Sequence, residues 1–401
     1  MIDTSSERRG KIWILLAMLT GIFLLNFLAR IILSPLLPSI EQDLGIGHGE
    51  AGRFFLYISI GYCLGLFGSG FLSSKFSHRS AITTSAMGIG IALLTIGIST
   101  SPIFIKTALV VMGLSAGVYL PSGMTMITTI IPRANWGKAI AAHELAPVVA
   151  YLAAPLLAES MLPWSSWRGV VSLVAIVSIA TGCIFRFSGV QSGPVGLEPS
   201  FANIREVTGS LTFWLMAFLF SIAIGASIGI FSMLPLYLVA EHGFTRHSAN
   251  VLIAFSRAGV IGSALIAGWL ADRFGDQRLI KYALFFNGAT IMLMGLGTGN
   301  VLTVSVFLQP ILSVCFFPAG FALISGFSRP ELRNLSVSLT VLIAYLTGAG
   351  FIPAVIGYWG EHNSFSAVII AIGTVMTGSL FLVGKLKPGT EGISSAPPPK
   401  P

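Results

Sequence analysis

The chain has 401 residues, of which 54% are hydrophobic and only 9% are charged, and its formal net charge is +8. An average soluble domain carries about 25% charged residues, so this chain cannot cover a water-facing surface, and the same composition excludes disorder. The three cysteines, Cys63, Cys183 and Cys315, are too scattered for a disulfide framework or a metal site. The basic residues lie in short connectors between apolar runs, which argues against a nucleic acid partner. We predict a polytopic membrane protein surrounded by the lipid bilayer.

Twelve apolar runs are long enough to cross a bilayer, since a spanning helix needs about 20 mostly apolar residues. They cover residues 12–37, 51–73, 80–99, 103–131, 136–158, 170–187, 211–238, 249–271, 280–298, 301–326, 335–358 and 364–384. The first run is too long for a signal peptide and another follows it at once, so we expect it to be retained. With the N-terminus inside the cell, 17 of the 23 Lys and Arg residues fall in inside segments and 4 in outside segments. The positive-inside rule therefore predicts a protein of the cell (inner) membrane with both termini cytoplasmic.

A polar segment that contains Ser, Gly and Pro divides the twelve runs into two sets of six. We predict an all-α fold with an N-terminal six-helix bundle at 1–188, a cytoplasmic loop at 189–210, a C-terminal six-helix bundle at 211–387 and a flexible cytoplasmic tail at 388–401. Moving the second half back by 198 residues aligns Gly268 with Gly70 and Pro353 with Pro155. Parallel repeats of this kind are one of the known architectures of secondary transporters.

The loop that follows the eighth run carries a family signature. Gly268-Trp-Leu-Ala-Asp272-Arg273-Phe-Gly resembles the signature loop of the major facilitator superfamily, and the first-half loop from Gly70 to Arg79 resembles a degenerate copy of it. The resemblance extends over all twelve runs and implies the two-bundle major facilitator fold. It also implies that Gly268, Asp272 and Arg273 form a conformational latch, whose Asp–Arg pair braces one state and is released in another. An ordinary positive-inside turn is the alternative interpretation of the same residues.

Only three charged residues lie well inside the predicted spans, namely Arg30, Glu144 and Arg257. Inserting a central Arg costs about 2.5–3.5 kcal/mol, and ionisable residues within the membrane usually serve a function. Arg30 shares one helix face with Asn26, four residues before it. This segment resembles the anion:cation symporters of the superfamily, although the family's Asp before the Arg is Ala29 here. The resemblance implies that Arg30 binds a substrate carboxylate.

Arg257 lies in the eighth run, in a setting that resembles the monocarboxylate and oxalate transporters, which implies that it anchors the substrate anion. Together with Arg30 from the other half, it would form a planar, always charged clamp for a carboxylate. We expect both arginines to face one water-filled cavity, with Asn26, Tyr119 and Tyr57 as further substrate-binding candidates. A bound anion would neutralise this cavity and let the halves rock together. The alternative is that a helix-packing partner satisfies each arginine.

His143 and Glu144 are neighbours in the fifth run. A buried histidine beside a carboxylate can titrate near neutral pH, which suits proton coupling, and His143 is also a candidate substrate ligand. Alternatively, Glu144 is the permanent counter-ion of one of the two buried arginines, and His143 is a hydrogen-bonded packing residue. No second His-Glu pair lies nearby in the sequence, so we expect no metal.

The sequence thus predicts a secondary active transporter, not an enzyme, that moves a small organic anion, a mono- or dicarboxylate, by proton symport or anion exchange. The sequence contains no nucleotide-binding P-loop and no nucleophile-elbow motif, and we expect no cofactor and no catalytic residues. The alternatives are an inorganic-anion carrier for nitrate or phosphate, a drug efflux transporter of the same fold and a non-transporting receptor. We expect a monomer. We expect the outside titratable residues to be solvated, namely His48, His242, His247, His362, Glu41, Asp43, Glu50, Glu241 and Glu361.

Overall fold

The structure is a computed structural model that describes residues 4–75, 77–188, 201–329 and 331–386. Every element within these ranges is a helix, and they contain no strand. The predicted tail at 388–401 and residues 189–200 of the predicted loop lie outside the described residues, as do the side chains of residues 70–76 in the first-half signature loop. The remainder of the predicted loop contains the short helix α9 (Phe201–Thr208).

The first half folds into helical rods that follow the first six predicted spans in order. They are α1 (Thr4–Ile31) with α2 (Leu33–Leu44), α3 (His48–Lys75), α4 (His78–Ile98), α5 (Pro102–Gly117) with α6 (Tyr119–Ile130), the turn η1 (Arg133–Asn135) with α7 (Trp136–Met161), and α8 (Trp167–Phe187). Pro38 lies inside α2, and Pro147 and Pro155 lie inside α7. Each proline removes a backbone hydrogen-bond donor from its helix, which favours a bend there.

The second half repeats this plan, with two segments of π-helix. It consists of α10 (Leu211–Ile224), η2 (Gly225–Gly229) and α11 (Ile230–Ala240), then α12 (Arg246–Ala258) with α13 (Val260–Phe274), α14 (Asp276–Leu296), α15 (Asn300–Val314) with α16 (Phe316–Phe327), α17 (Arg333–Ala344), η3 (Tyr345–Phe351) and α18 (Ile352–His362), and finally α19 (Phe365–Gly378) with α20 (Leu380–Val383). The segments η2 and η3 are π-helical. Such wide turns often occur at functional sites.

By length and composition, eleven rods of the described chain can cross a membrane, from Ile12–Leu44 to Phe365–Val383. The rod of α12 and α13 completes the predicted twelve, because it is helical on both sides of Gly259 and contains the predicted run 249–271. Its first part, α12, carries polar residues at several positions. The prediction of an all-α, multi-pass membrane protein is confirmed.

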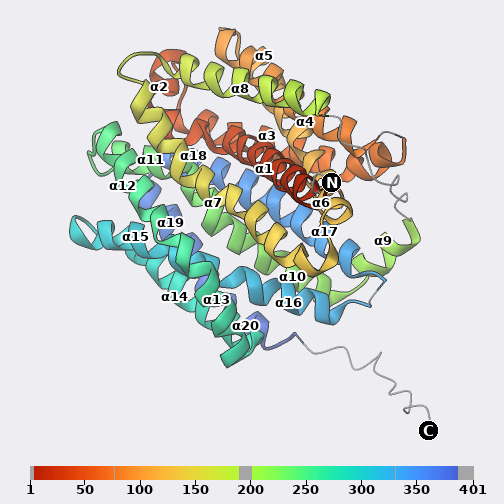
Figure 1. The fold of residues 1–401 in the computed structure, drawn as a ribbon. Coiled ribbons are helices and arrows are strands. Elements are labelled where there is room, and N and C mark those ends of the chain that lie inside the picture. Colours follow the sequence, from red (N-terminus) through yellow and green to blue (C-terminus); the bar gives the residue numbers. More distant parts are fainter. Residues whose placement is uncertain (1–3, 76, 189–200, 330, 387–401) are drawn as a thin grey trace.

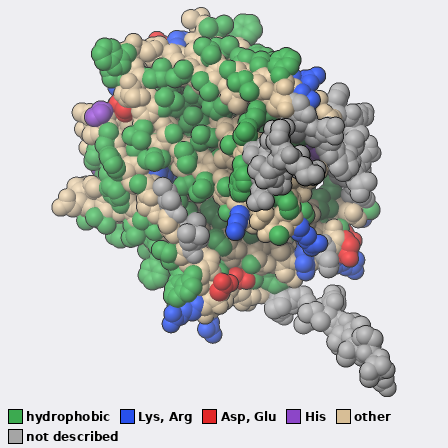
Figure 2. Space-filling model, in the orientation of Figure 1, with side chains coloured by type: hydrophobic (Ala, Val, Ile, Leu, Met, Phe, Trp, Pro, Cys, Tyr) green, Lys and Arg blue, Asp and Glu red, His purple; other side chains and the backbone are tan. Residues whose placement is uncertain are grey.

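The rods of both halves run in a common direction, and their loops gather at two ends (Figure 1). We call the end with the N-terminus and α9 the connector side, and the end with the loops after α2, α7 and α11 the far side. One hydrophobic core runs through both halves, with Leu33 and Ile58 from the first and Phe231 and Ala349 from the second. Hydrophobic side chains also cover much of the surface, and charged side chains lie mainly toward the edges of the view (Figure 2), as expected for a protein surrounded by lipid.

Glycines allow helices to approach closely within and between the halves. A Cβ atom at Gly113 of α5 would overlap the carbonyl of Ile58 in α3, and a Cβ atom at Gly357 of α18 would overlap the carbonyl of His48 in α3. Small residues at such crossings let neighbouring backbones pack together in a membrane. The second contact joins the two halves near the far side.

Candidate functional site

Arg30 lies at the end of α1, in the middle of the molecule, and it is 4% exposed. Its Nη1 atom donates a hydrogen bond of 2.9 Å to the hydroxyl of Tyr345 in the other half, and its Nε atom donates one of 3.4 Å to the Asn26 carbonyl. The guanidinium carbon lies 4.7 Å from the ring centroid of Phe27 and 4.5 Å from that of Tyr62. Aromatic faces attract a cation electrostatically and thus stabilise the buried charge in part.

Arg257 lies in the last turn of α12 and is also 4% exposed. Its guanidinium carbon is 4.7 Å from the ring centroids of both Tyr151 and Phe231. Its Nε atom is buried without a hydrogen-bond partner among the described residues. No ion pair to Arg30 or Arg257 occurs within the described part of the chain. Both arginines are therefore buried cations without a neighbouring carboxylate.

The two arginines share one set of aromatic rings. The Tyr151 ring lies 5.2 Å from that of Phe27 and 4.7 Å from that of Phe231, and it interacts electrostatically with both guanidinium groups. We call Phe27, Tyr62, Tyr151, Phe231 and Tyr345 the aromatic cage; it receives rings from both halves. The sequence predicts a water-filled cavity at this point, whereas in this conformation the rings cover the arginines.

A cavity of about 220 Å³ lies between the halves on the connector side. It is lined by residues of α3, α6, α9 and α17, namely Leu66, Phe67, Ser69, Pro121, Ile204, Leu335, Ser338, Leu339 and Leu342. At its inner end the Cys63 thiol donates a hydrogen bond of 3.3 Å to the Leu342 carbonyl. The stacked rings of Tyr62 and Tyr345, with centroids 4.4 Å apart, follow within one helical turn of these residues. The tyrosine pair, which contacts Arg30, therefore lies about one helical turn from the residues at the inner end of this cavity.

Three other predicted site residues are engaged within the first half. Asn26 donates a hydrogen bond of 3.0 Å to the Ala116 carbonyl, and Tyr119 donates one of 2.7 Å to the Leu19 carbonyl. His143 is fully buried, and its Nε2 atom lies 3.0 Å from the Tyr119 hydroxyl. These polar atoms hold α1, α5, α6 and α7 together, which corresponds to the packing alternative for His143.

Glu144 and Tyr57 lie in different surroundings. The Glu144 side chain is 49% exposed, and its Oε1 atom lies 3.2 Å from Nδ1 of His143. Glu144 forms no ion pair with Arg30 or Arg257 within the described residues. Tyr57 is partly buried and interacts with Lys106, nearer the far side, so the structure does not bring it to the cage.

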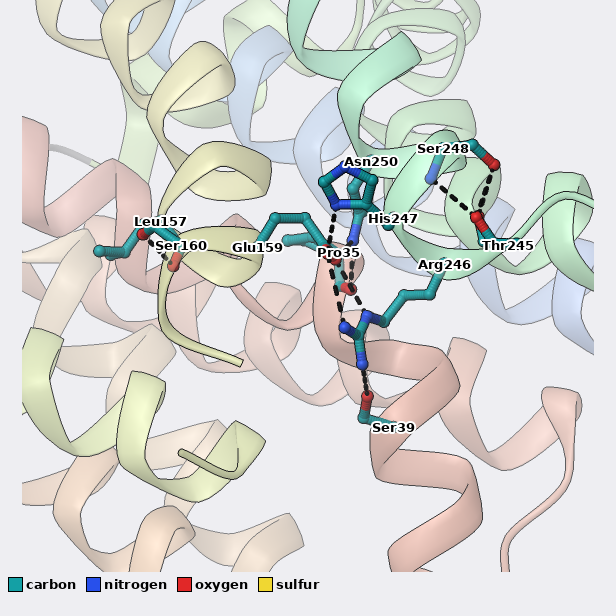
Figure 3. Close-up of polar contacts among 10 residues, drawn as sticks. All are labelled: Pro35, Ser39, Leu157, Glu159, Ser160, Thr245, Arg246, His247, Ser248 and Asn250. Atoms are coloured by element: carbon teal, nitrogen blue, oxygen red, sulfur yellow. Dashed lines mark hydrogen bonds and ion pairs between the residues drawn. The ribbon is translucent and has the colours of Figure 1, made fainter. Parts of the chain in front are cut away.

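The far side is closed by a polar cluster that sequence analysis did not single out. The buried carboxylate of Glu159 in α7 accepts hydrogen bonds from Arg246 (3.0 Å), His247 (3.1 Å) and Asn250 (2.7 Å) at the start of α12 (Figure 3). Arg246 also reaches Ser39 of α2 at 3.4 Å. We call these five residues the far-side cluster. It joins the two halves directly, and the only signal for it in the sequence is an acidic residue at the end of an apolar run.

Several of the outside titratable residues, which we predicted to be solvated, also form polar contacts within the protein, although Glu241 and Glu361 are exposed. The Glu361 carboxylate accepts a hydrogen bond of 2.7 Å from the amide of Gly49 in the other half, and Glu41 lies 2.8 Å from His48. Glu241 accepts hydrogen bonds from Ser364 and from the amide of Phe365, at the start of α19. Burial raises the pKa of Glu241, but these hydrogen bonds and one from the Ser366 amide outweigh it, so the net pKa lies below its ordinary value.

The predicted latch residues lie at the connector end of α13. Asp272 and Arg273 are exposed, and the guanidinium carbon of Arg273 lies 5.2 Å from the ring centroid of Trp269. A Cβ atom at Gly268 would meet no other atom within 4 Å. Within the described residues Asp272 forms no ion pair, so the Asp–Arg contact is not made in this conformation.

Two relatives are similar to most of this chain. A protein of Mycobacterium tuberculosis described as "Probable nitrate/nitrite transporter" is 23% identical over 278 residues, which cover 67% of this chain and 69% of that protein. A 4-hydroxybenzoate transporter of Pseudomonas aeruginosa is 20% identical over 407 residues, with 88% of each chain covered.

A solved structure supports the fold. The crystal structure of a bacterial homologue of the human lysosomal transporter Spinster, in an inward-facing and unoccupied conformation, aligns with a TM-score of 0.76 at 15% identity and covers 94% of this chain and 95% of that one. The family model for the Major Facilitator Superfamily matches residues 19–299 and again residues 215–401, which together span most of the chain. The chain is therefore a member of the major facilitator superfamily of membrane transporters.

Proposed function

We propose that this transporter moves a small organic anion, a mono- or dicarboxylate, and that Arg30 and Arg257 bind its carboxylate. The observation that carries the proposal is the presence of two buried guanidinium groups, one from each half, without an acidic partner among the described residues. An uncompensated buried charge is costly, so an anion that enters between the halves gains two strong partners. Guanidinium groups match carboxylates in shape and donate two parallel hydrogen bonds.

The aromatic cage supports a flat substrate. Rings cover the faces of both guanidinium groups, so an anion that approaches Arg30 or Arg257 also contacts aromatic surface. Offset stacking against such rings favours planar, conjugated molecules. The 4-hydroxybenzoate transporter among the relatives has a substrate of this kind. An aromatic or unsaturated carboxylate therefore fits the site best.

Nitrate transport is the second candidate. Nitrate is planar and anionic, arginine also suits it, and one relative is described as a nitrate/nitrite transporter. The cage and the cavity of about 220 Å³ next to it provide more apolar surface than nitrate can use, which favours the organic anion. Drug efflux is the least supported candidate, because the membrane-embedded charge is mainly positive.

Transport in this proposal follows alternating access between the bundles at 1–188 and 211–387. The basic connectors favour the connector side as the cytoplasmic side, with both termini there. With that orientation, the closed far side and the connector-side cavity correspond to an inward-directed conformation. Glu144 carries the coupled proton, because its side chain is half exposed within a predicted span, and His143, 3.2 Å away, orients its carboxylate.

Uptake into proteoliposomes tests the proposal. The panel consists of 4-hydroxybenzoate, benzoate, muconate, acetate, phosphate and nitrate, each with and without a pH gradient. We expect carboxylate uptake that Arg30→Lys and Arg257→Lys each reduce at least tenfold, because lysine keeps the charge and loses the planar pair of donors. Arg53→Lys is the matched control, since Arg53 pairs with Glu50 at the surface. Saturable uptake of nitrate alone would favour the second candidate, and unchanged carboxylate uptake in both lysine variants would refute the arginine clamp.

A further inference from the structure

Arg30 has a hydrogen-bond acceptor from the other half of the protein. The Tyr345 hydroxyl, from the second half, accepts the 2.9 Å hydrogen bond of the Arg30 Nη1 atom. Tyr345 is buried, and its ring lies against the guanidinium, with 5.3 Å between the guanidinium carbon and the ring centroid. Its hydroxyl oxygen thus occupies a donor direction that a carboxylate oxygen would need for two-point binding. Arg257 shows the contrasting situation, because its Nε atom has no partner among the described residues.

Tyr345 also lies close to the connector-side cavity. Its ring packs on that of Tyr62 with 4.4 Å between centroids, and the cavity-lining residues Leu66 and Leu342 lie one helical turn away on the same two helices. The hydroxyl that satisfies Arg30 therefore belongs to a tyrosine pair next to this cavity.

The backbone at Tyr345 has an unusual local geometry. Tyr345 is the first residue of the π-helical segment η3, which packs against the second π-helical segment, η2. Gly348 in η3 lies so close to η2 that a Cβ atom there would be 2.6 Å from the Gly225 nitrogen. π-Helical turns are rare and occur frequently at functional sites.

We propose that Tyr345 is a displaceable internal ligand of Arg30. In the empty site its hydroxyl satisfies the guanidinium and its ring closes the path to the cavity. An incoming carboxylate replaces the hydroxyl on Arg30, and the displaced tyrosine shifts η3 relative to η2. Substrate binding is thereby coupled to the shape of the helix that lines the cavity. This inference rests on the proposed function, because it requires an anion at Arg30.

The proposal predicts that removing the hydroxyl strengthens binding. In Tyr345→Phe the ring remains, but the empty site contains an unpaired guanidinium proton, which is a state of higher free energy. The carboxylate no longer competes with an internal acceptor, so we expect its dissociation constant to fall about tenfold. We expect the tighter binding to slow release of the anion, so KM and kcat should fall together. A tyrosine that contacts the substrate directly would produce the opposite change in affinity.

Equilibrium binding and uptake with the same anion panel test this inference, with Tyr282→Phe as the matched control. Tyr282 lies in α14, is 52% exposed and packs on Phe274, away from the aromatic cage, so we expect its Phe variant to change affinity less than twofold. Weaker binding in Tyr345→Phe, or equal effects of the two variants, would overturn the proposal. If no panel anion binds the wild type, or if Arg30→Lys binds normally, the proposed function itself fails. Thermal stability and expression of each variant show whether it is folded.

Discussion

Replacing Glu159 by Gln gives a quantitative test of how the far side is held closed. The variant keeps an acceptor oxygen for Asn250 and removes the charge that Arg246 and His247 face. A hydrogen bond to a charged group contributes about 1.5–3 kcal/mol, whereas an exposed ion pair contributes about 0–1 kcal/mol. The side chain of Glu159 is 7% exposed, but those of Arg246 and His247 are 34% and 71% exposed. We therefore expect the charge of Glu159 to stabilise the closed far side by about 2 kcal/mol, in the lower part of the range for charged hydrogen bonds. Loss of this free energy corresponds to a roughly thirtyfold shift toward states with an open far side.

Distance measurements between spin labels detect this shift. Trp164 and Thr298 are exposed residues in far-side loops of opposite halves, and each can be replaced by a labelled cysteine after the three native cysteines are changed to serine. We expect a longer-distance population in Glu159→Gln that is minor in the wild type. Glu50→Gln is the control, because Glu50 pairs with Lys106 within one half. An unchanged distance distribution in Glu159→Gln, or the same change in both variants, would refute the role of the far-side cluster.

Three further predictions concern the proton, the π-helical contact and acid stability. Glu144→Gln should abolish uptake driven by a pH gradient and preserve counterflow exchange of the anion; loss of both activities would identify Glu144 as a structural counter-ion instead. Gly348→Ala should lower both uptake and the melting temperature, because its Cβ would lie 2.6 Å from the backbone of η2. Such overpacking lowers the free energy of unfolding by about 1–3 kcal/mol. Gly378→Ala, with open space around it, should change neither uptake nor the melting temperature. Glu241 has a lowered pKa, so its stabilising contribution is present above its ordinary pKa of 4.5 and is lost as the pH falls through the folded-state pKa. When the pH is lowered below 4.5, the melting temperature of Glu241→Gln should therefore fall less than that of the wild type. Equal falls of the two melting temperatures would contradict this assignment.

The sequence was sufficient to predict the helices, because each spanning run is long and apolar whatever it packs against. The same hydropathy pattern does not distinguish an α-turn from a π-turn, so η2 and η3 could not be predicted from it. The burial of Arg30 and Arg257 followed from their positions within apolar runs. Their aromatic surroundings did not, because Phe27 and Tyr151 are ordinary members of such runs until the fold brings them together.

Contacts between the halves were the least predictable feature. Tyr345 lies 315 residues from Arg30 in the chain, and Glu159 lies 87 residues from Arg246. No local pattern marks such pairs, and Glu159 has the appearance of an ordinary loop acid. Asn26 shares a helix face with Arg30, but close packing in the first half directs the polar atoms of Asn26 and Tyr119 to backbone carbonyls. Helical periodicity predicts the helix face on which a residue lies, whereas only the packed structure identifies its hydrogen-bond partner.

The central claim is that two buried arginines bind a carboxylate, and the discrimination between a carboxylate and its uncharged carboxamide tests it most directly. Equilibrium binding of the best-transported acid and of its amide should differ by about 100-fold or more in the wild type, because two charge-assisted interactions of about 1.5–3 kcal/mol each are lost with the amide. In the double variant Arg30→Gln/Arg257→Gln the ratio should fall to a few-fold. Equal affinities for acid and amide in the wild type, or a ratio that persists without the two arginines, would contradict the account.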